Sequence, residues 1–201
     1  MGLREIKAEK TRKRILREAL LLFKRDGYEQ TTMEAIAEGA EIGPRTLYRY
    51  FASKDLILLG PLTGNPDFSA AFSRHAVNHP VEEALAEAIL EWAKWQDTNS
   101  EEILLVLSLI DQAPIARAKL WDLVNQQERS LSARLAEKLN LPEDDLRVVL
   151  ASRHVLLTII RTVSEQSRAG AGRSSSIEYA KQAMRMFAEH KVPLPRKTPC
   201  H

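Results

Sequence analysis

The sequence predicts an all-α protein in which a small N-terminal three-helix domain packs on a larger C-terminal helical domain. Almost every segment repeats its apolar residues with the 3.6-residue period of a helix, and none alternates as a strand would. Short helices separated by glycine, proline and capping residues fill residues 1–60, and longer helices follow. Hydrophobic residues make up 44% of the 201 positions, which is enough to form a buried core.

The first two helices are predicted from their caps. The first runs from about residue 5 to Asp26 and ends at Gly27, which suits the position after a helix. Its apolar stripe has i, i+4, i+7, i+8 spacing and consists of Ile15, Ala19, Leu22 and Phe23. The second opens at Thr31, which can form a capping box with Glu34, and ends near Ala40.

The third helix begins at Gly43 and Pro44, because proline is favoured at the first helical position. The fourth runs from Ser53, a good N-cap residue, to Leu59. The breakers between Gly60 and Pro66 then predict a boundary or hinge. Further helices are expected at about 67–79, 80–97, 101–113, 114–140, 142–169 and 175–190. The predicted domains are 1–59 and 67–190, followed by a disordered Pro-rich tail at 191–201.

Several classes of protein are disfavoured. The longest nearly apolar run, Ile103–Ile110, is far shorter than the roughly 20 residues of a membrane span. The charged start of the chain shows no signal peptide, and the single Cys200 cannot form an internal disulfide. We therefore expect a cytoplasmic protein without a membrane partner.

Enzyme and metal motifs are not expected either. His75 and His79 have the i, i+4 spacing of a helical metal pair, but Ala76 replaces the glutamate of H-E-x-x-H and Pro80 follows directly. The sequence has no Gly-rich phosphate loop and no nucleophile elbow. We predict no enzyme, no metal and no cofactor.

Positive charge is concentrated at the beginning of the chain. Residues 1–60 carry 12 Lys and Arg against 9 Asp and Glu. Within residues 1–17 only Glu5 and Glu9 oppose a set of seven cations, namely Arg4, Lys7, Lys10, Arg12, Lys13, Arg14 and Arg17. Such a run is either a solvated helix face or, beside a DNA-binding motif, an electrostatic footprint for phosphates.

The three helices within residues 5–51 have the arrangement of a DNA-binding helix-turn-helix. Their shared core is predicted from Phe23, Ile36, Ala37, Ile42, Leu47 and Phe51. The helix that starts at Pro44 then exposes Arg45, Thr46, Tyr48, Arg49 and Tyr50. Because an α-helix fits the major groove of DNA, this helix is the predicted recognition helix.

Over roughly residues 10–57 the sequence resembles the TetR family of transcriptional regulators. The segments that carry the resemblance are TTMEAIA at 31–37 and IGPRTLYRYFASKDL at 42–56. The resemblance implies phosphate contacts from Thr32, Tyr48, Tyr50 and Lys54, and base contacts from Arg45, Thr46 and Arg49, with Pro44 beside them. Alternatively, Tyr48 and Tyr50 flank the core and Arg49 is only a solvated charge.

Two positions depart from the family pattern. Glu41 stands where a glycine is usual, with a glycine at position 39 instead, and a left-handed backbone at Glu41 would cost about 1 kcal/mol. Gly43 replaces the usual serine N-cap, which removes one possible phosphate contact.

The last two long helices are predicted to form a dimer interface. Segment 142–169 has one apolar face with Leu146, Leu150 and Leu157, and another with Val148, Val155 and Ile159. Two such faces could serve the core and a partner subunit at once. With helix 175–190 they predict a homodimer, as the resemblance implies, whereas the alternative is one large monomer core.

A ligand pocket in the C-terminal half requires polar and aromatic groups within an apolar shell. The candidates are Trp92, Trp95, Ser108, Asp111, Gln112, Trp121, His154 and Thr158. His154 and the tryptophans could equally be ordinary core residues. This half also resembles, less closely, TetR members related to mycofactocin-type regulators, some of which sense acyl thioesters.

Together these features predict a ligand-released repressor that binds a pseudo-palindromic operator as a homodimer, with an inducer of unknown identity. The alternative is a helical adaptor that binds a protein partner and has lost its operator.

Overall fold

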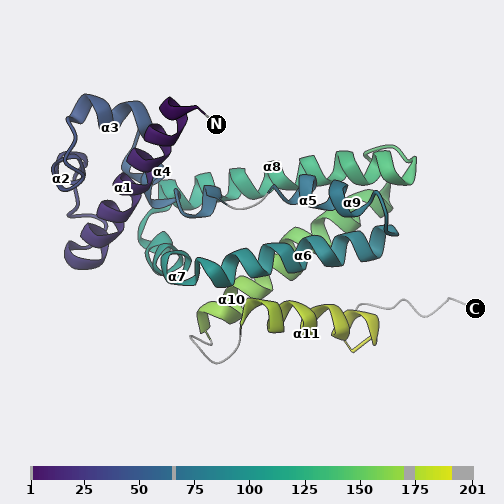
Figure 1. The fold of residues 1–201 in the computed structure, drawn as a ribbon. Helices are drawn as coiled ribbons and strands as arrows, with labels where there is room; N and C mark the ends of the chain where they lie inside the picture. Colours follow the sequence, from purple (N-terminus) through teal and green to yellow (C-terminus); the bar gives the residue numbers. More distant parts are fainter. Residues whose placement is uncertain (1, 65–66, 170–174, 192–201) are drawn as a thin grey trace, which may run out of the picture. The chain divides into compact units, whose positions relative to one another are not determined.

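The computed structural model describes residues 2–64, 67–169 and 175–191, except the side chains of residues 3, 158–160, 163, 167 and 168. The described residues form helices and no strand, which confirms the all-α prediction (Figure 1). None of these helices is both long and apolar enough to cross a membrane. Of the tail predicted at 191–201, all but Lys191 lies outside the described residues.

The chain divides into two compact units. The first contains residues up to Asn65 together with Thr98–Gln126, and the second contains Pro66–Asp97 and the residues from Gln127 onward. Residues 98–126 thus pack with the N-terminal helices, although the predicted domain 67–190 included them. The functional division into a DNA-binding and a ligand-sensing domain stays a prediction.

The first unit consists of the N-terminal helices, two later ones and part of a third. Its elements are α1 (Leu3–Asp26), α2 (Met33–Gly39), α3 (Pro44–Tyr50), α4 (Lys54–Leu58), the 3₁₀ turn η1 (Leu62–Gly64), α7 (Ser100–Leu109), η2 (Ile110–Gln112) and the beginning of α8 (Pro114–Leu139). The side chains of Ile15, Phe23 and Leu47 are buried in its core, as the apolar pattern predicts. Val106, Ile110 and other residues of α7, η2 and early α8 complete the same core, so this helix-turn-helix is not closed by its own three helices alone.

The start of α2 differs from the predicted capping box. Thr32, and not Thr31, is the N-cap residue, and its hydroxyl accepts a hydrogen bond from the backbone N–H of Ala35 at 3.1 Å. Thr31 is instead buried, and its hydroxyl donates to the carbonyl of Gly27. The prediction failed because both residues are good caps and only the turn from Gly27 decides between them.

Between α2 and α3 the chain turns through a left-handed residue. Glu41 has a φ of 52°, so the departure from the usual glycine does place an L side chain in a strained conformation. The third helix begins as predicted, with Gly43 as N-cap and Pro44 in the first turn.

Gly60 does not have the surroundings of a free hinge residue. It is buried, and a Cβ at this position would clash with Leu16 Cδ2 of α1. A Cβ added at Gly64, by contrast, would meet no other atom within 4 Å. Gly60 therefore allows close packing between α1 and the segment after α4.

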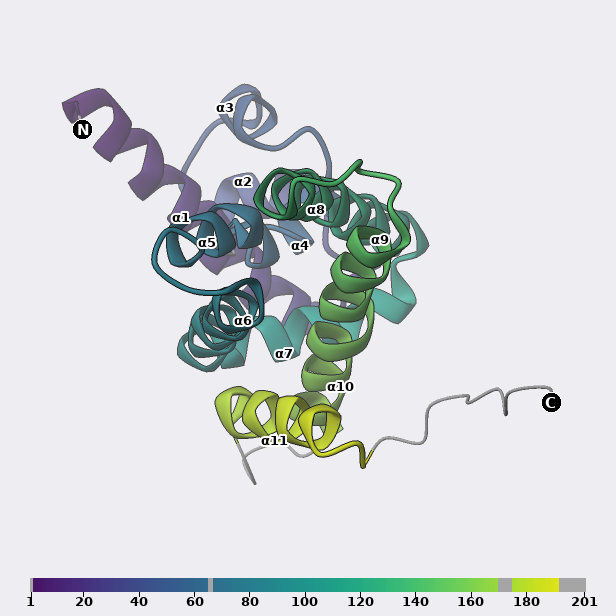
Figure 2. The same ribbon diagram turned by 90° about the vertical axis from the view of Figure 1, so that its right-hand side faces the viewer.

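The second unit contains the remaining helices, which surround an apolar core. They are α5 (Phe68–His75), α6 (Val81–Thr98, of which Thr98 belongs to the first unit), the rest of α8, α9 (Leu146–Arg153), the π-helical segment η3 (His154–Ile160), α10 (Arg161–Ala169) and α11 (Ser176–Ala188). Figure 2 shows α10 and α11 of this unit beside each other. Phe68, Phe72, Trp92, Leu131 and Leu135 are among its buried side chains.

The predicted helix 142–169 is interrupted in two ways. It begins only at Leu146, because the Asp145 carboxylate caps it by accepting a hydrogen bond from the N–H of Arg147 at 2.9 Å. It then passes through a π-helical segment, which the 3.6-residue period could not reveal. At the next helix, Asp97 of α6 accepts hydrogen bonds from the backbone N–H groups of Ser176 and Ile177 and so holds the start of α11.

Candidate nucleic-acid interface

The helix α3 presents a polar face to solvent and an apolar face to the core. Leu47 is fully buried, whereas Pro44, Arg45, Tyr48 and Arg49 are exposed. Tyr48 leaves 49% of its surface in solvent, so its hydroxyl is accessible to a binding partner. This division fixes the helix on the core and leaves its cations free to reach base edges or phosphates.

Thr46 and Tyr50 are half-buried at the edges of the same face. The guanidinium of Arg49 lies 5.5 Å from the centre of the Tyr50 ring, an arrangement that orients the arginine. Thr32 is exposed at the start of α2. Seven of the eight predicted DNA contacts therefore lie on α3 or at the start of α2, and their role in DNA binding stays a prediction.

Lys54 has other partners than the predicted phosphate. Its ammonium donates to the carbonyls of Tyr28 at 2.7 Å, Thr31 at 3.0 Å and Glu29 at 3.2 Å. An ammonium has three donors, so all of them are directed to the loop between α1 and α2. Lys54 therefore supports this loop, and its predicted phosphate contact stays a prediction.

A hydrogen bond between a tyrosine and an aspartate also stabilises this loop. The Tyr28 hydroxyl donates to Asp55 Oδ1 at 2.8 Å. Burial, followed by this hydrogen bond to a carboxylate, raises the pKa of Tyr28 above its ordinary value, so the donor stays protonated. Residues at the start of α4 thus fix the loop that precedes α2, a long-range link that spacing in the sequence could not reveal.

Arginine also links α1 to the end of α3. The Arg12 guanidinium lies 4.7 Å from the centre of the Phe51 ring and donates to Thr63 Oγ1 at 3.0 Å. In the sequence, Arg12 is only one of seven cations near the start of the chain. The general signal, a basic residue on a helix beside an aromatic residue of the core, is too common to identify the pair.

The candidate ligand residues are divided between the two units. Ser108, Asp111, Gln112 and Trp121 belong to the first unit and are exposed, and the Ser108 hydroxyl bonds to the carbonyl of Leu105 in its own helix. In the second unit Trp92 is buried in the apolar core, and Trp95 packs against that core. The ligand role of these residues stays a prediction.

His154 is half-buried in the second unit, where its ring meets the edge of Phe187 at a centroid distance of 4.2 Å. Burial lowers the pKa of His154 below its ordinary value and so favours the neutral ring. These contacts favour the alternative of a packed core histidine. Thr158, four residues later, lies outside the residues whose side chains the structure describes.

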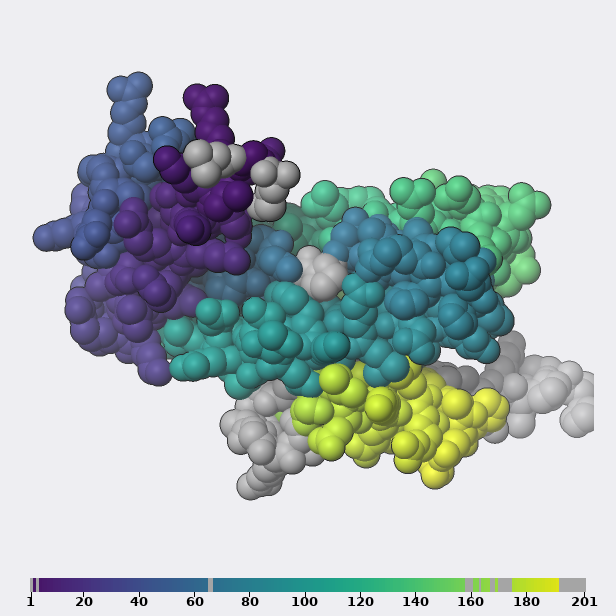
Figure 3. Space-filling view, in the orientation of Figure 1, coloured from purple at the N-terminus to yellow at the C-terminus, as the bar shows by residue number. Residues whose placement is uncertain are grey.

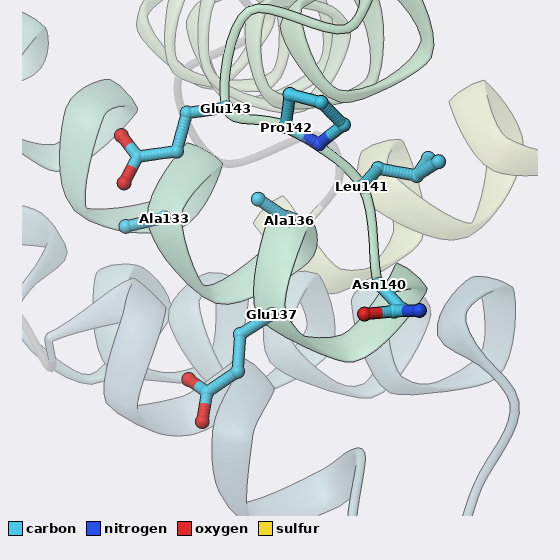
Figure 4. Close-up of a pocket in the computed structure, with 7 residues that line it drawn as sticks. All are labelled: Ala133, Ala136, Glu137, Asn140, Leu141, Pro142 and Glu143. Atoms are coloured by element: carbon cyan, nitrogen blue, oxygen red, sulfur yellow. The ribbon is translucent and has the colours of Figure 1, made fainter.

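A surface hollow of the second unit lies elsewhere. Figure 4 shows it at the end of α8 and the segment leading to α9, lined by Ala133, Ala136, Glu137, Asn140, Leu141, Pro142 and Glu143. None of the candidate ligand residues lines it, so the hollow gives them no support.

Comparison with known proteins agrees with the helix-turn-helix geometry. The model of the family "Bacterial regulatory proteins, tetR family" matches residues 15–59. The transcriptional regulator TcmR of Streptomyces glaucescens is 32% identical over 151 residues, which cover 72% of this chain and 67% of TcmR. The transcriptional repressor KstR of Rhodococcus jostii is 49% identical over 51 residues, about a quarter of each chain (25% and 24%).

Solved structures show the same fold. The TetR family regulator PfmR from Thermus thermophilus aligns with a TM-score of 0.57 and 26% identity, covering 87% of this chain and 97% of PfmR. FadR from Bacillus subtilis, solved in complex with stearoyl-CoA, aligns with a TM-score of 0.64 over 87% of this chain and 96% of FadR. At 17% identity, FadR shows a common fold alone.

These relatives are transcriptional regulators and not enzymes, and the identity to TcmR extends well beyond the helix-turn-helix. The chain therefore belongs to the TetR family and is a DNA-binding transcriptional regulator.

Proposed function

We propose that this regulator binds a pseudo-palindromic operator as a homodimer and is released from it by a small molecule. The observation that carries the proposal is the exposed face of α3, which carries Arg45, Tyr48 and Arg49, whereas Leu47 of the same helix is fully buried. A two-fold dimer would place two such helices in successive major grooves. Because its target is operator DNA, we propose the cytoplasm as the place where it acts.

Arg45 is proposed to read a base and Tyr48 to contact a phosphate. Arginine can pair bidentately with guanine in the major groove, whereas a tyrosine hydroxyl suits the backbone.

Replacing Arg45 separates these two roles. Arg45→Ala is expected to weaken operator binding by about 1–3 kcal/mol and to relax the preference at one base pair of each half-site. The measurement is a titration by fluorescence anisotropy against the operator and its single-base variants. Lys24→Ala, which removes an exposed cation at the C-terminal end of α1, is the control and should leave the base preference unchanged. An equal loss on every sequence would make Arg45 a phosphate contact.

The dimer surface is proposed on α9, α10 and α11. Val148 and Val155 are buried in the core, whereas Leu146 and Leu150 leave 68% and 58% of their surface exposed in the single chain. On α11, Met186 is also exposed. Such apolar side chains on the outer face of two helices favour a partner subunit over a large monomer core.

Introducing charged side chains on the exposed face of α9 tests the proposed dimer interface. Leu146→Arg with Leu150→Arg is expected to yield a folded monomer, since both side chains already face solvent, and to lower operator affinity by a factor of ten or more (~1.4 kcal/mol). Sedimentation equilibrium measures the oligomeric state. Val77→Arg, at a valine with 75% of its surface exposed, is the control. If the double variant stayed dimeric, the interface would lie elsewhere.

A small-molecule inducer would act by preferring the conformer that binds DNA poorly. Its candidate contacts stay the eight residues predicted from the sequence, namely Trp92, Trp95, Ser108, Asp111, Gln112, Trp121, His154 and Thr158. Any compound that lowers operator affinity must itself bind the protein–DNA complex more weakly by the same factor.

A further inference from the structure

The first turns of α1 carry charges that the proposed contacts of α2 and α3 do not use. We call residues Gly2–Lys10 the basic arm. Among its described side chains none is buried, and the first buried side chain of α1 is Ile15. The arm thus has no visible role in the core of the first unit, and its composition needs another explanation.

The charge of the arm is not neutralised within the chain. Its carboxylates have local partners: Glu5 accepts a hydrogen bond from the backbone N–H of Gly2 at 2.8 Å, and Glu9 lies 3.8 Å from Lys13. Arg4, Lys7 and Lys10 are exposed, and within the described part of the chain none of the three forms an ion pair. The arm therefore presents three unpaired cations to solvent.

The arm lies at the edge of the first unit where α3 lies. Both views place the start of α1 and the helix α3 at the same height, and Figure 2 shows the arm extending sideways beyond α3. In the space-filling view, side chains of the α3 region and of early α1 project from the same edge (Figure 3). A duplex bound along α3 would continue past the arm, where its phosphates complement the three cations.

From this placement and charge we propose that the basic arm contacts the phosphate backbone outside the bases read by α3, on both sides of the operator. The inference rests on the proposed function, since it requires α3 to bind DNA. Phosphate contacts carry no sequence information, so the arm contributes affinity and salt dependence but no base preference.

Two probes and two variants test this. The probes are the operator selected from random duplex DNA and the same operator extended by about ten base pairs, one helical turn, on each side. The arm variant is Arg4→Gln with Lys7→Gln and Lys10→Gln. The control removes three exposed cations at the other end of α1 and on the second unit, by Lys24→Gln with Arg129→Gln and Arg134→Gln. Far-UV circular dichroism and thermal unfolding establish that both variants are folded.

For the wild type, we expect the extension to tighten binding about tenfold or more near 0.1 M salt. The slope of log Kd against log salt concentration should steepen by about 3–5, because up to six phosphates are neutralised per dimer. For the arm variant, we expect the extension to change neither the affinity nor the salt slope. The control should show both changes, and all three proteins keep the same base preference.

Three results would overturn the proposal. The arm does not reach flanking DNA if the extension leaves the affinity of the wild type unchanged. The same follows if the extension raises the affinity of the arm variant as much as that of the control. A changed base preference in the arm variant would show base reading in place of phosphate contact. These results differ from failure of the proposed function, in which the wild type selects no sequence at all.

Discussion

Replacing Lys54 by methionine is expected to lower the free energy of unfolding by about 2–4 kcal/mol, because the carbonyls of Tyr28, Glu29 and Thr31 lose a charged donor. Its ammonium also lies 4.4 Å from the centre of the Tyr28 ring, so a favourable cation–π contact is lost as well. Urea unfolding followed by circular dichroism measures the change.

Lys119→Met provides a matched control in the same unit. Among the described residues, the Lys119 ammonium donates to Ser53 Oγ at 3.2 Å, and we expect a loss below about 1 kcal/mol. The phosphate role that the family resemblance implies for Lys54 gives a different result. A stable Lys54→Met variant whose salt dependence of DNA binding falls by about 2 per dimer would support that role.

Gly60→Ala should lower the free energy of unfolding by about 1–3 kcal/mol through overpacking. The added Cβ would clash with Leu16 Cδ2 and would lie 2.9 Å from the carbonyl oxygen of Ile57. The leucine can move, but the backbone carbonyl cannot without disturbing the end of α4. Thermal and urea unfolding of the purified variant measure the loss.

Two further variants decide whether packing is the cause. Gly64→Ala places its Cβ in open space and is expected to be neutral or slightly stabilising. Leu16→Ala should cost less in the Gly60→Ala background than in the wild type, because the smaller side chain relieves the contact. Additive losses, or a Gly60→Ala variant as stable as the wild type, would mean that Gly60 is not a packing residue.

The packing of Gly60 bears on the hinge that the sequence predicts between Gly60 and Pro66. In the sequence, its glycines and prolines indicate a hinge. In the structure, Gly60 instead lies against α1, so stiffening both glycines at once would report on packing as well as flexibility. Composition shows that a helix ends here, but it does not show what the glycine contacts.

The local features were predictable from the sequence because neighbouring residues determine them. The start of α3 at Gly43 and Pro44, the left-handed Glu41 and the buried Leu47 follow from propensity and from the family pattern. The face of α3 follows from its period, since burial of Leu47 leaves Arg45 and Tyr48 outside.

Long-range contacts were beyond such reasoning. The partners of Lys54 lie more than 20 residues earlier in the chain, and the core of the first unit includes Val106 and Ile110. An apolar period shows that one face of a helix is buried but not which helix covers it, so the period of α7 could not show that it packs in the core of the first unit. The π-helical segment that starts at His154 has no signature in the period either.

The most direct test of the central claim is selection of bound sequences from random duplex DNA by the purified protein, at two salt concentrations. We predict an enriched inverted repeat at both concentrations, with half-sites about one helical turn apart and a base preference that Arg45→Ala weakens. Retention of no sequence, or weak binding without preference that disappears at the higher salt concentration, would contradict operator reading by α3. The alternative of a helical adaptor that binds a protein partner would then be favoured.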